Sequence, residues 1–118
     1  MEQEYIKGDI VMYDNKIHTI MDTLGVNNYE LSYISHQVHQ LELSGVPITP
    51  EILEKNGWRS INGKYALKIK NANYVVLEFT EDGIYTYINE NTMLFTIKYI
   101  HELQHLLFGL ELNFEMEV

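Results

Sequence analysis

The chain has 118 residues, of which 46% are hydrophobic, and it contains no cysteine; we therefore predict one domain without disulfides or thiolate metal sites. Its formal net charge is −9, and acidic residues outnumber basic ones by nine to three over residues 1–57 and by eight to five over residues 58–118. Nucleic acids and anionic membranes attract clustered lysine and arginine, so this charge balance predicts neither as a partner.

The first predicted lobe, residues 1–48, has the pattern of a bent antiparallel β-sheet with short strands and tight turns. Asp14-Asn15 tolerates the positive φ of a hairpin turn. Alternation along the third strand would place Tyr29, Leu31 and Tyr33 on one face. The opening Gly-Asp-x-Val-x-Tyr stretch resembles the first hairpin of SH3-like barrels. The four predicted strands span residues 10–13, 16–21, 29–34 and 38–43.

A short helix over residues 50–55 is predicted to link this sheet to a second lobe, residues 49–118. Thr49 is a favourable N-cap, and Pro50 suits the first helical position. Asn56-Gly57 is expected to end the helix. The two lobes together predict a single domain of the α+β class.

The second lobe is predicted to continue as an antiparallel β-meander. Asn62-Gly63 is among the strongest short signals for a hairpin. Tyr85 and Tyr87 share a strand face, where they either pack within the sheet or form an aromatic patch for a protein partner. The predicted strands span residues 58–61, 65–69, 74–79 and 84–88, followed by a turn over residues 89–92.

A long helix is predicted over residues 96–108, with Thr96 as the N-cap and Gly109 at the end. A final strand over residues 110–118 is predicted from strict alternation, with Glu111 and Glu115 pointing away from the core. The apolar stripe of the helix comprises Tyr99, Ile100, Leu103, Leu106, Leu107 and Leu110. We expect Ile100, Leu103 and Leu107 to pack against the meander near Val76 and Tyr85. Lys98, His101, Glu102 and His105 fall on the opposite face, which we expect to be solvated.

The same helix contains His-Glu-Leu-Gln-His, which matches the zinc-binding helix of metallopeptidases. In that alternative, His101 and His105 would bind zinc and Glu102 would act on a bound water. A third ligand is needed, and Glu111 is the only acidic or His residue that follows closely. The extended form of the motif requires Gly at position 108 and His at 111, where this chain has Phe108 and Glu111. We therefore expect no stoichiometric zinc, and we expect His105→Asn to leave folding intact.

Three further histidines are expected to have no ligand role. His18 occupies a polar position of an alternating strand, which predicts a surface side chain. His36 and His39 would point to opposite faces if their segment runs from a loop into a strand.

The stretch from Pro47 to Trp58, the meander and the helix sequence Lys-Tyr-Ile-His-Glu-Leu-Gln-His together resemble a group of short proteins from phages and mobile elements of Bacteroidetes. The group's helix pattern maps onto Tyr99, Ile100, His101, Leu103 and Gln104. Members of that group can have Gln or Asn where this chain has Glu102 and His105, which implies that the zinc motif is local to this sequence. The group has no assigned activity.

The sequence therefore predicts a small acidic protein of the bacterial cytoplasm that acts as a non-catalytic protein-interaction or accessory module, without a cofactor. Two alternatives stay open. One is a minimal zinc-dependent hydrolase that uses the helix motif, and the other is a structural component of a virion.

Overall fold

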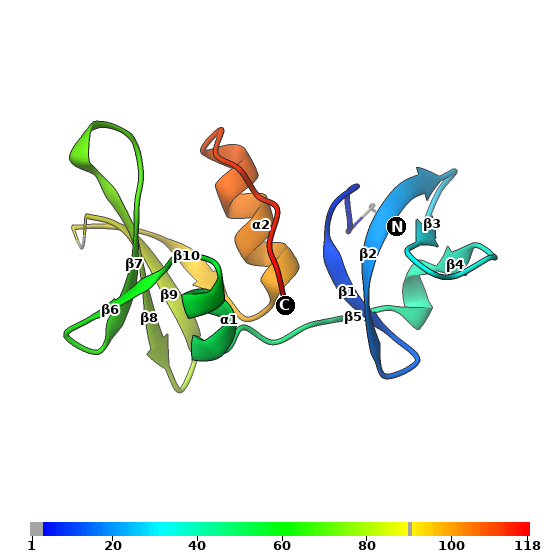
Figure 1. Ribbon diagram of the computed structural model, residues 1–118, viewed down its shortest axis with the longest axis horizontal. Coiled ribbons are helices and arrows are strands. Elements are labelled where there is room, and N and C mark those ends of the chain that lie inside the picture. Colours follow the sequence, from blue (N-terminus) through cyan, green and yellow to red (C-terminus); the bar gives the residue numbers. More distant parts are fainter. Residues whose placement is uncertain (1–3, 90) are drawn as a thin grey trace. The chain divides into compact units, whose positions relative to one another are not determined.

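The computed structural model describes residues 4–89 and 91–118, and these residues form an α+β fold (Figure 1) with two five-stranded antiparallel sheets and two α-helices. The chain divides into two compact units: residues 1–47 with 99–116, and residues 48–98 with 117–118. The first unit thus includes the C-terminal helix α2 (Ile100–Gly109), which the sequence analysis assigned to the second lobe.

The first unit is built on a sheet with strand order β4-β3-β2-β1-β5. Strand β2 pairs with β1 over its first four residues and with β3 over its second half, with a register irregularity between Ile20 and Asp22. Asp14 and Asn15 form the β1–β2 turn with φ values of 51° and 61°, as predicted. The strands are β1 (Ile10–Tyr13), β2 (Lys16–Leu24), β3 (Asn28–Leu31), β4 (Val38–His39) and β5 (Ser44–Gly45).

A compact aromatic and aliphatic cluster forms the core of this sheet. The ring of Tyr5 meets the ring of Tyr29 edge-on at 5.6 Å between centroids. The Tyr29 hydroxyl donates to Gln40 Oε1 at 2.8 Å, so its polar end is satisfied inside the core. The buried members are Tyr5, Val11, Ile20, Tyr29, Leu31, Val38 and Leu43.

Two strand predictions in this unit are wrong. The third strand ends at Leu31, and Tyr33 adopts a positive φ of 63° in the following turn, where its side chain is 99% exposed. The predicted strand over residues 38–43 is interrupted by a 3₁₀ helix, η1 (Gln40–Glu42). Local hydrogen bonds explain the interruption, because His39 Nδ1 accepts from the Leu41 amide and Glu42 accepts from the His39 amide.

Helix α2 begins later than predicted, with Tyr99 rather than Thr96 as the N-cap, because strand β10 (Thr92–Ile97) takes up Thr96. The Ile100 amide donates to the Val46 carbonyl at 2.8 Å, which anchors the start of α2 in the first unit. The helix ends with Gly109, Leu110 is its C-cap, and Glu111 after it has a left-handed backbone with φ of 60°. The described tail after α2 contains no strand, so the predicted final strand is wrong.

The second unit is a meander with strand order β10-β9-β8-β7-β6 and a short helix, α1 (Pro50–Lys55), with Thr49 as the N-cap, as predicted. Asn62 and Gly63 form the β6–β7 turn with φ values of 52° and 80°, also as predicted. One face of the sheet is its core, where Val75, Leu77, Ile84, Thr86 and Ile97 are buried. The remaining elements are β6 (Arg59–Ile61), β7 (Lys64–Lys68), η2 (Lys70–Ala72), β8 (Tyr74–Thr80) and β9 (Gly83–Ile88).

The predicted turn over residues 89–92 includes Glu90, which lies outside the described residues. Across the described ranges, no helix is long and apolar enough to cross a membrane.

Candidate functional site

The metallopeptidase-like motif lies on α2, and its acidic residue caps the helix. Glu102 Oε1 accepts a hydrogen bond from the Tyr99 amide at 3.0 Å. A carboxylate at this position satisfies a backbone N–H that the helix leaves without an internal partner, and it interacts favourably with the helix dipole. Glu102 therefore has a structural contact in the place where the zinc alternative would assign it a catalytic role.

His105 forms the shortest polar contact of the motif, with a carboxylate from the start of the chain. His105 Nε2 lies 2.6 Å from Asp9 Oδ2, and Asp9 is fully buried. The same Asp9 oxygen accepts from the Ile6 amide at 2.9 Å. The hydrogen bond to Asp9 raises the pKa of His105 above its ordinary value, while partial burial acts in the opposite direction. This pair joins the segment before β1 to α2.

His101 is almost completely buried, with 4% of its surface exposed. Its ring stacks on the ring of Tyr99 at 5.8 Å and meets the ring of Tyr5 edge-on at 4.9 Å. Its Nε2 lies 3.9 Å from a carboxylate oxygen of Glu4, and its buried Nδ1 has no hydrogen-bond partner among the described residues. Burial lowers the pKa of His101 below its ordinary value, although neighbouring carboxylates oppose this effect.

Gln104, between the two histidines, forms three side-chain hydrogen bonds to backbone groups. Its Oε1 accepts from the Ile10 amide at 2.9 Å, and its Nε2 donates to the carbonyls of Gly8 and Phe114 at 2.9 and 3.0 Å. The side chain is fully buried. It therefore connects the start of β1, α2 and the tail with one amide group.

The prediction of a solvated polar face on α2 is therefore wrong for His101, which is buried, and only partly right for His105. Residues 4–10 cover that face through the contacts of Tyr5 and Asp9. The predicted burial of Ile100, Leu103 and Leu107 is confirmed, since all three side chains are buried. The helix is thus covered on both its apolar and its polar side. The prediction that His105→Asn has no effect on folding must be replaced, because the substitution would remove a partner of a buried carboxylate.

The third ligand of the zinc alternative, Glu111, is not grouped with the two histidines. Glu111 follows the end of α2 and is exposed. Within residues 4–89 and 91–118, no three His, Asp or Glu side chains are grouped so that they could hold a metal ion. The absence of stoichiometric zinc stays a prediction, which metal analysis of the purified protein would test.

The remaining histidines have local partners. His18 is buried, contrary to the prediction, and its Nδ1 lies 2.8 Å from the carbonyl oxygen of Ser32. His36 is exposed, with Nε2 at 3.4 Å from the Tyr13 hydroxyl. His39 caps the 3₁₀ helix described above.

We expect the two histidines of α2 to contribute to stability in opposite pH ranges. The pKa of His105 is raised in the folded state, so its contribution is complete below its unfolded pKa of about 6.5 and is lost as the pH rises through the folded value. The pKa of His101 is lowered, so its contribution is present above about 6.5 and is lost as the pH falls through the folded value. The nearby carboxylates of Glu4, Asp9 and Glu102 act on both rings.

Urea unfolding of His105→Gln and His101→Phe between about pH 5 and pH 8.5 would measure these contributions. Relative to the wild type, His105→Gln should lose more stability at the acidic end. His101→Phe should gain relative stability there, because it removes a buried group that must otherwise become protonated. His36→Gln, at an exposed position, is the control and should follow the wild type. If the stability of both variants changed with pH in the same way as that of the wild type, the opposite contributions assigned to His101 and His105 would be wrong.

A second candidate site lies on the meander, on the face opposite its buried core. Arg59 on β6 is directly opposite Ala66 on β7, which is directly opposite Val76 on β8. Residues directly opposite in antiparallel strands point to the same face, and so do residues two apart along one strand. We call this surface the open face and define it by Arg59, Ile61, Lys64, Ala66, Lys68, Tyr74 and Val76.

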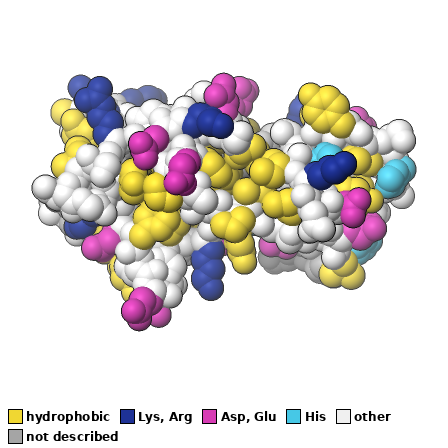
Figure 2. Space-filling model, turned by 60° about the horizontal axis from the view of Figure 1, so that its bottom comes forward, with side chains coloured by type: hydrophobic (Ala, Val, Ile, Leu, Met, Phe, Trp, Pro, Cys, Tyr) yellow, Lys and Arg dark blue, Asp and Glu magenta, His cyan; other side chains and the backbone are white. Residues whose placement is uncertain are grey.

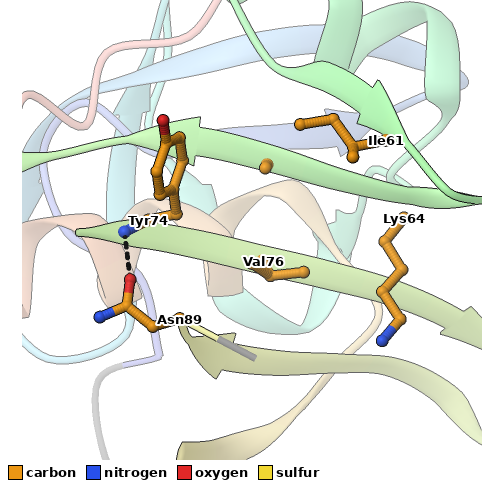
Figure 3. Close-up of a pocket in the computed structure, with 6 residues that line it drawn as sticks. Ile61, Lys64, Tyr74, Val76 and Asn89 are labelled. Atoms are coloured by element: carbon orange, nitrogen blue, oxygen red, sulfur yellow. Dashed lines mark hydrogen bonds between the residues drawn. The ribbon is translucent and has the colours of Figure 1, made fainter. Parts of the chain in front are cut away.

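Two overlapping hollows lie on the open face. The first has a volume of about 240 Å³ and is lined by Ile61, Lys64, Ala66, Tyr74, Val76 and Asn89 (Figure 3). The second, of about 460 Å³, shares Ile61, Ala66 and Tyr74 and extends to Gly57, Arg59, Leu67 and Lys68. The three shared residues therefore form the centre of one continuous depression across β6, β7 and β8.

The walls of the depression are exposed apolar side chains, and its floor consists of buried side chains on paired strands. Ile61 is 48% and Tyr74 39% exposed, whereas Ala66 and Val76 are buried beneath them. Asn89 Oδ1 accepts from the Tyr74 amide at 2.7 Å, and Asn89 Nδ2 donates to Asn73 Oδ1 at 2.7 Å. These hydrogen bonds fix the start of β8 and hold Tyr74 in place at the side of the hollow (Figure 3).

Basic side chains surround this apolar centre. Arg59, Lys64 and Lys68 lie on the open face, and none of the three forms an ion pair with a carboxylate of the described residues. Lys64 Nζ lies 5.9 Å from the centre of the Tyr87 ring. Glu78, on the same face, accepts a hydrogen bond from the Tyr87 hydroxyl at 3.1 Å. At the left of Figure 2, basic side chains lie beside hydrophobic ones on the second unit.

Sequence reasoning identified only part of this surface. Tyr85 and Tyr87 share a face as predicted, since they lie opposite Glu78 and Val76. Ile61 and Tyr74 were not singled out, although the Asn62-Gly63 turn fixes the register that brings Ile61 opposite Lys64. The alternation of polar and apolar residues in the two hairpins indicates which side chains share a face. The register between β7 and β8, however, depends on the less regular turn at η2, which the sequence does not determine.

Comparison of the chain with protein-family models, with curated protein sequences and with solved structures gives no match.

Proposed function

We propose that this chain is a small non-catalytic protein-interaction module and that the open face is its contact surface. The observation that supports the proposal most directly is a depression with exposed Ile61 and Tyr74 on a buried floor. Interface centres are enriched in aromatic side chains and large apolar groups held by a rigid scaffold. Five paired strands supply such a scaffold here.

The contacts of the helix motif support a non-catalytic role. Glu102 is hydrogen-bonded to the Tyr99 amide, His105 to Asp9, and His101 is enclosed by Tyr5 and Tyr99. A zinc hydrolase would need both histidines to turn towards one ion and a third ligand to approach them. That rearrangement would break the contacts that connect α2 to the start of the chain.

We further propose that the first unit is a small SH3-like barrel. Its strand order, the division of β2 between two partners and the 3₁₀ helix between β4 and β5 are compatible with that architecture. On the basis of the resemblance described above, we also propose that the protein comes from a phage or mobile element. We propose that it acts in the cytoplasm of a bacterial host.

Selection of short random peptides on the immobilised full chain would test the proposed function. Peptides enriched on the wild type should lose binding to Ile61→Asp and to Tyr74→Ser, because both substitutions remove apolar walls of the depression. Val26→Asp, at an exposed apolar position of the first unit, is the matched control and should retain binding. Failure to enrich any peptide, or enriched peptides that bind Ile61→Asp as well as the wild type, would refute the open face as the contact surface.

A further inference from the structure

We infer that the open face binds an extended peptide segment in which one large apolar side chain is flanked, two residues away on each side, by carboxylates. The inference rests on the proposed function and specifies the partner of the same surface. Three features support it: the register of the basic side chains, the size of the hollow, and the distribution of charge along the chain.

The register places one lysine on each side of the apolar floor. Lys64, Ala66 and Lys68 alternate along β7, so their side chains share a face. With a rise of about 3.3 Å per residue, each lysine is anchored roughly 6.6 Å from Ala66 along the strand. An extended peptide that runs along β7 has the same spacing between residues two apart. A side chain above Ala66 would therefore have its second neighbours level with Lys64 and Lys68.

The hollow above Ala66 matches the central side chain of such a peptide. Its volume of about 240 Å³ gives room for one aromatic or long aliphatic group between Ile61 and Tyr74. Figure 3 shows Val76 between Tyr74 and Lys64, so a group inserted there would touch apolar atoms next to the lysine side chain. Burial of one such side chain is the main source of affinity in small recognition sites.

The charge distribution favours an acidic ligand at this face. Residues 48–98 contain six of the eight basic residues of the chain and six acidic ones, whereas all other residues together contain two basic and eleven acidic ones. The open face itself carries Arg59, Lys64 and Lys68, and the carboxylate of Glu78 is engaged by Tyr87. An acidic peptide would be attracted to this face, while the strongly acidic remainder of the chain would repel it.

Titration of the isotopically labelled full chain, followed by amide chemical shifts, tests the inference with three peptides. The first is acetyl-Ser-Glu-Ser-Phe-Ser-Glu-Ser-amide. The second replaces both Glu residues with Gln, and the third moves them next to Phe. The first peptide should shift amides of β6, β7 and β8 and bind roughly tenfold more tightly than the other two, since each partly exposed charge pair contributes modestly.

Charge-reversal variants show whether the lysines of the open face contribute to binding of the first peptide. Lys64→Glu combined with Lys68→Glu should weaken binding of the first peptide about tenfold or more. Lys16→Glu, an exposed charge reversal in the first unit, should leave it unchanged. Amide spectra of each free variant report whether it is folded.

The outcomes distinguish the two proposals. Shifts at the open face that are equal for the Glu and Gln peptides would overturn the inference and retain the open face as a contact surface. Tighter binding of a single-stranded oligonucleotide than of the first peptide, or occupation of the face by a second copy of the chain, would also overturn it. Shifts confined to the first unit, or no shift with any peptide, would overturn the inference and the proposed function together.

Discussion

Gln104→Leu should lower the free energy of unfolding by about 3–5 kcal/mol, because three hydrogen bonds end on one buried amide group. Leucine would fill much of the space but would leave the Ile10 amide and the carbonyls of Gly8 and Phe114 without their partner. Each buried polar group left unsatisfied costs about 1–3 kcal/mol. The effect should therefore exceed that of a typical surface substitution several-fold.

Urea unfolding followed by far-UV circular dichroism is the suitable measurement, because the only tryptophan, Trp58, lies in the second unit and would not report on α2 directly. Gln37→Leu makes the same chemical change at an exposed position and should alter stability by less than about 0.5 kcal/mol. Equal effects of the two substitutions would show that Gln104 does not hold the first unit together.

Leu103→Ala should lower the free energy of unfolding by about 2–5 kcal/mol, the range for removing a buried leucine side chain and leaving a cavity. Leu103 is completely buried near the middle of α2. Its neighbours in sequence, Glu102 and Gln104, are held by their own hydrogen bonds, so the helix cannot easily shift to fill the space.

Leu41→Ala provides the control, because Leu41 is 76% exposed and the same atoms are removed. Its substitution should change stability by less than about 0.5 kcal/mol. A loss below about 1 kcal/mol for Leu103→Ala would mean that the site collapses around the smaller side chain or that the helix packs less firmly than the structure shows.

Turns and helix starts that depend on contacts between residues close in sequence could be predicted. The Asp14-Asn15 and Asn62-Gly63 turns and the helix capped by Thr49 all depend on contacts within a few residues. Errors occurred where distant segments compete. Thr96 is a good N-cap by type, but pairing with Tyr85 places it in β10. The alternating tail could form a strand, but Glu111 adopts a left-handed backbone with φ of 60°, and Phe114 packs edge-on against Phe108.

The polar face of α2 illustrates the limit of a helical wheel. The wheel placed His101 and His105 opposite the apolar stripe, but it could not show that Tyr5 and Asp9, more than ninety positions earlier in the chain, would contact them. In the sequence, Asp9 is only part of the opening Gly-Asp-x-Val-x-Tyr stretch. Its role as the partner of His105 requires the tertiary fold.

The contacts of α2 give the His-Glu-Leu-Gln-His sequence a structural explanation. Glu102 caps the helix, Gln104 binds three backbone groups and His105 binds Asp9. The motif therefore holds α2 in the first unit, and we propose that binding takes place on the open face of the second unit.

Metal content and thermal stability of the purified full chain test this account most directly. We expect no stoichiometric zinc, and a melting temperature that changes by less than about 1 °C on addition of zinc or of a chelator, since only a ligand bound to the folded state stabilises it. His105→Asn should lower the melting temperature of the metal-free protein, because Asp9 loses its partner. One zinc ion per chain, with a rise of several degrees that His105→Asn abolishes, would contradict the account and favour the zinc hydrolase.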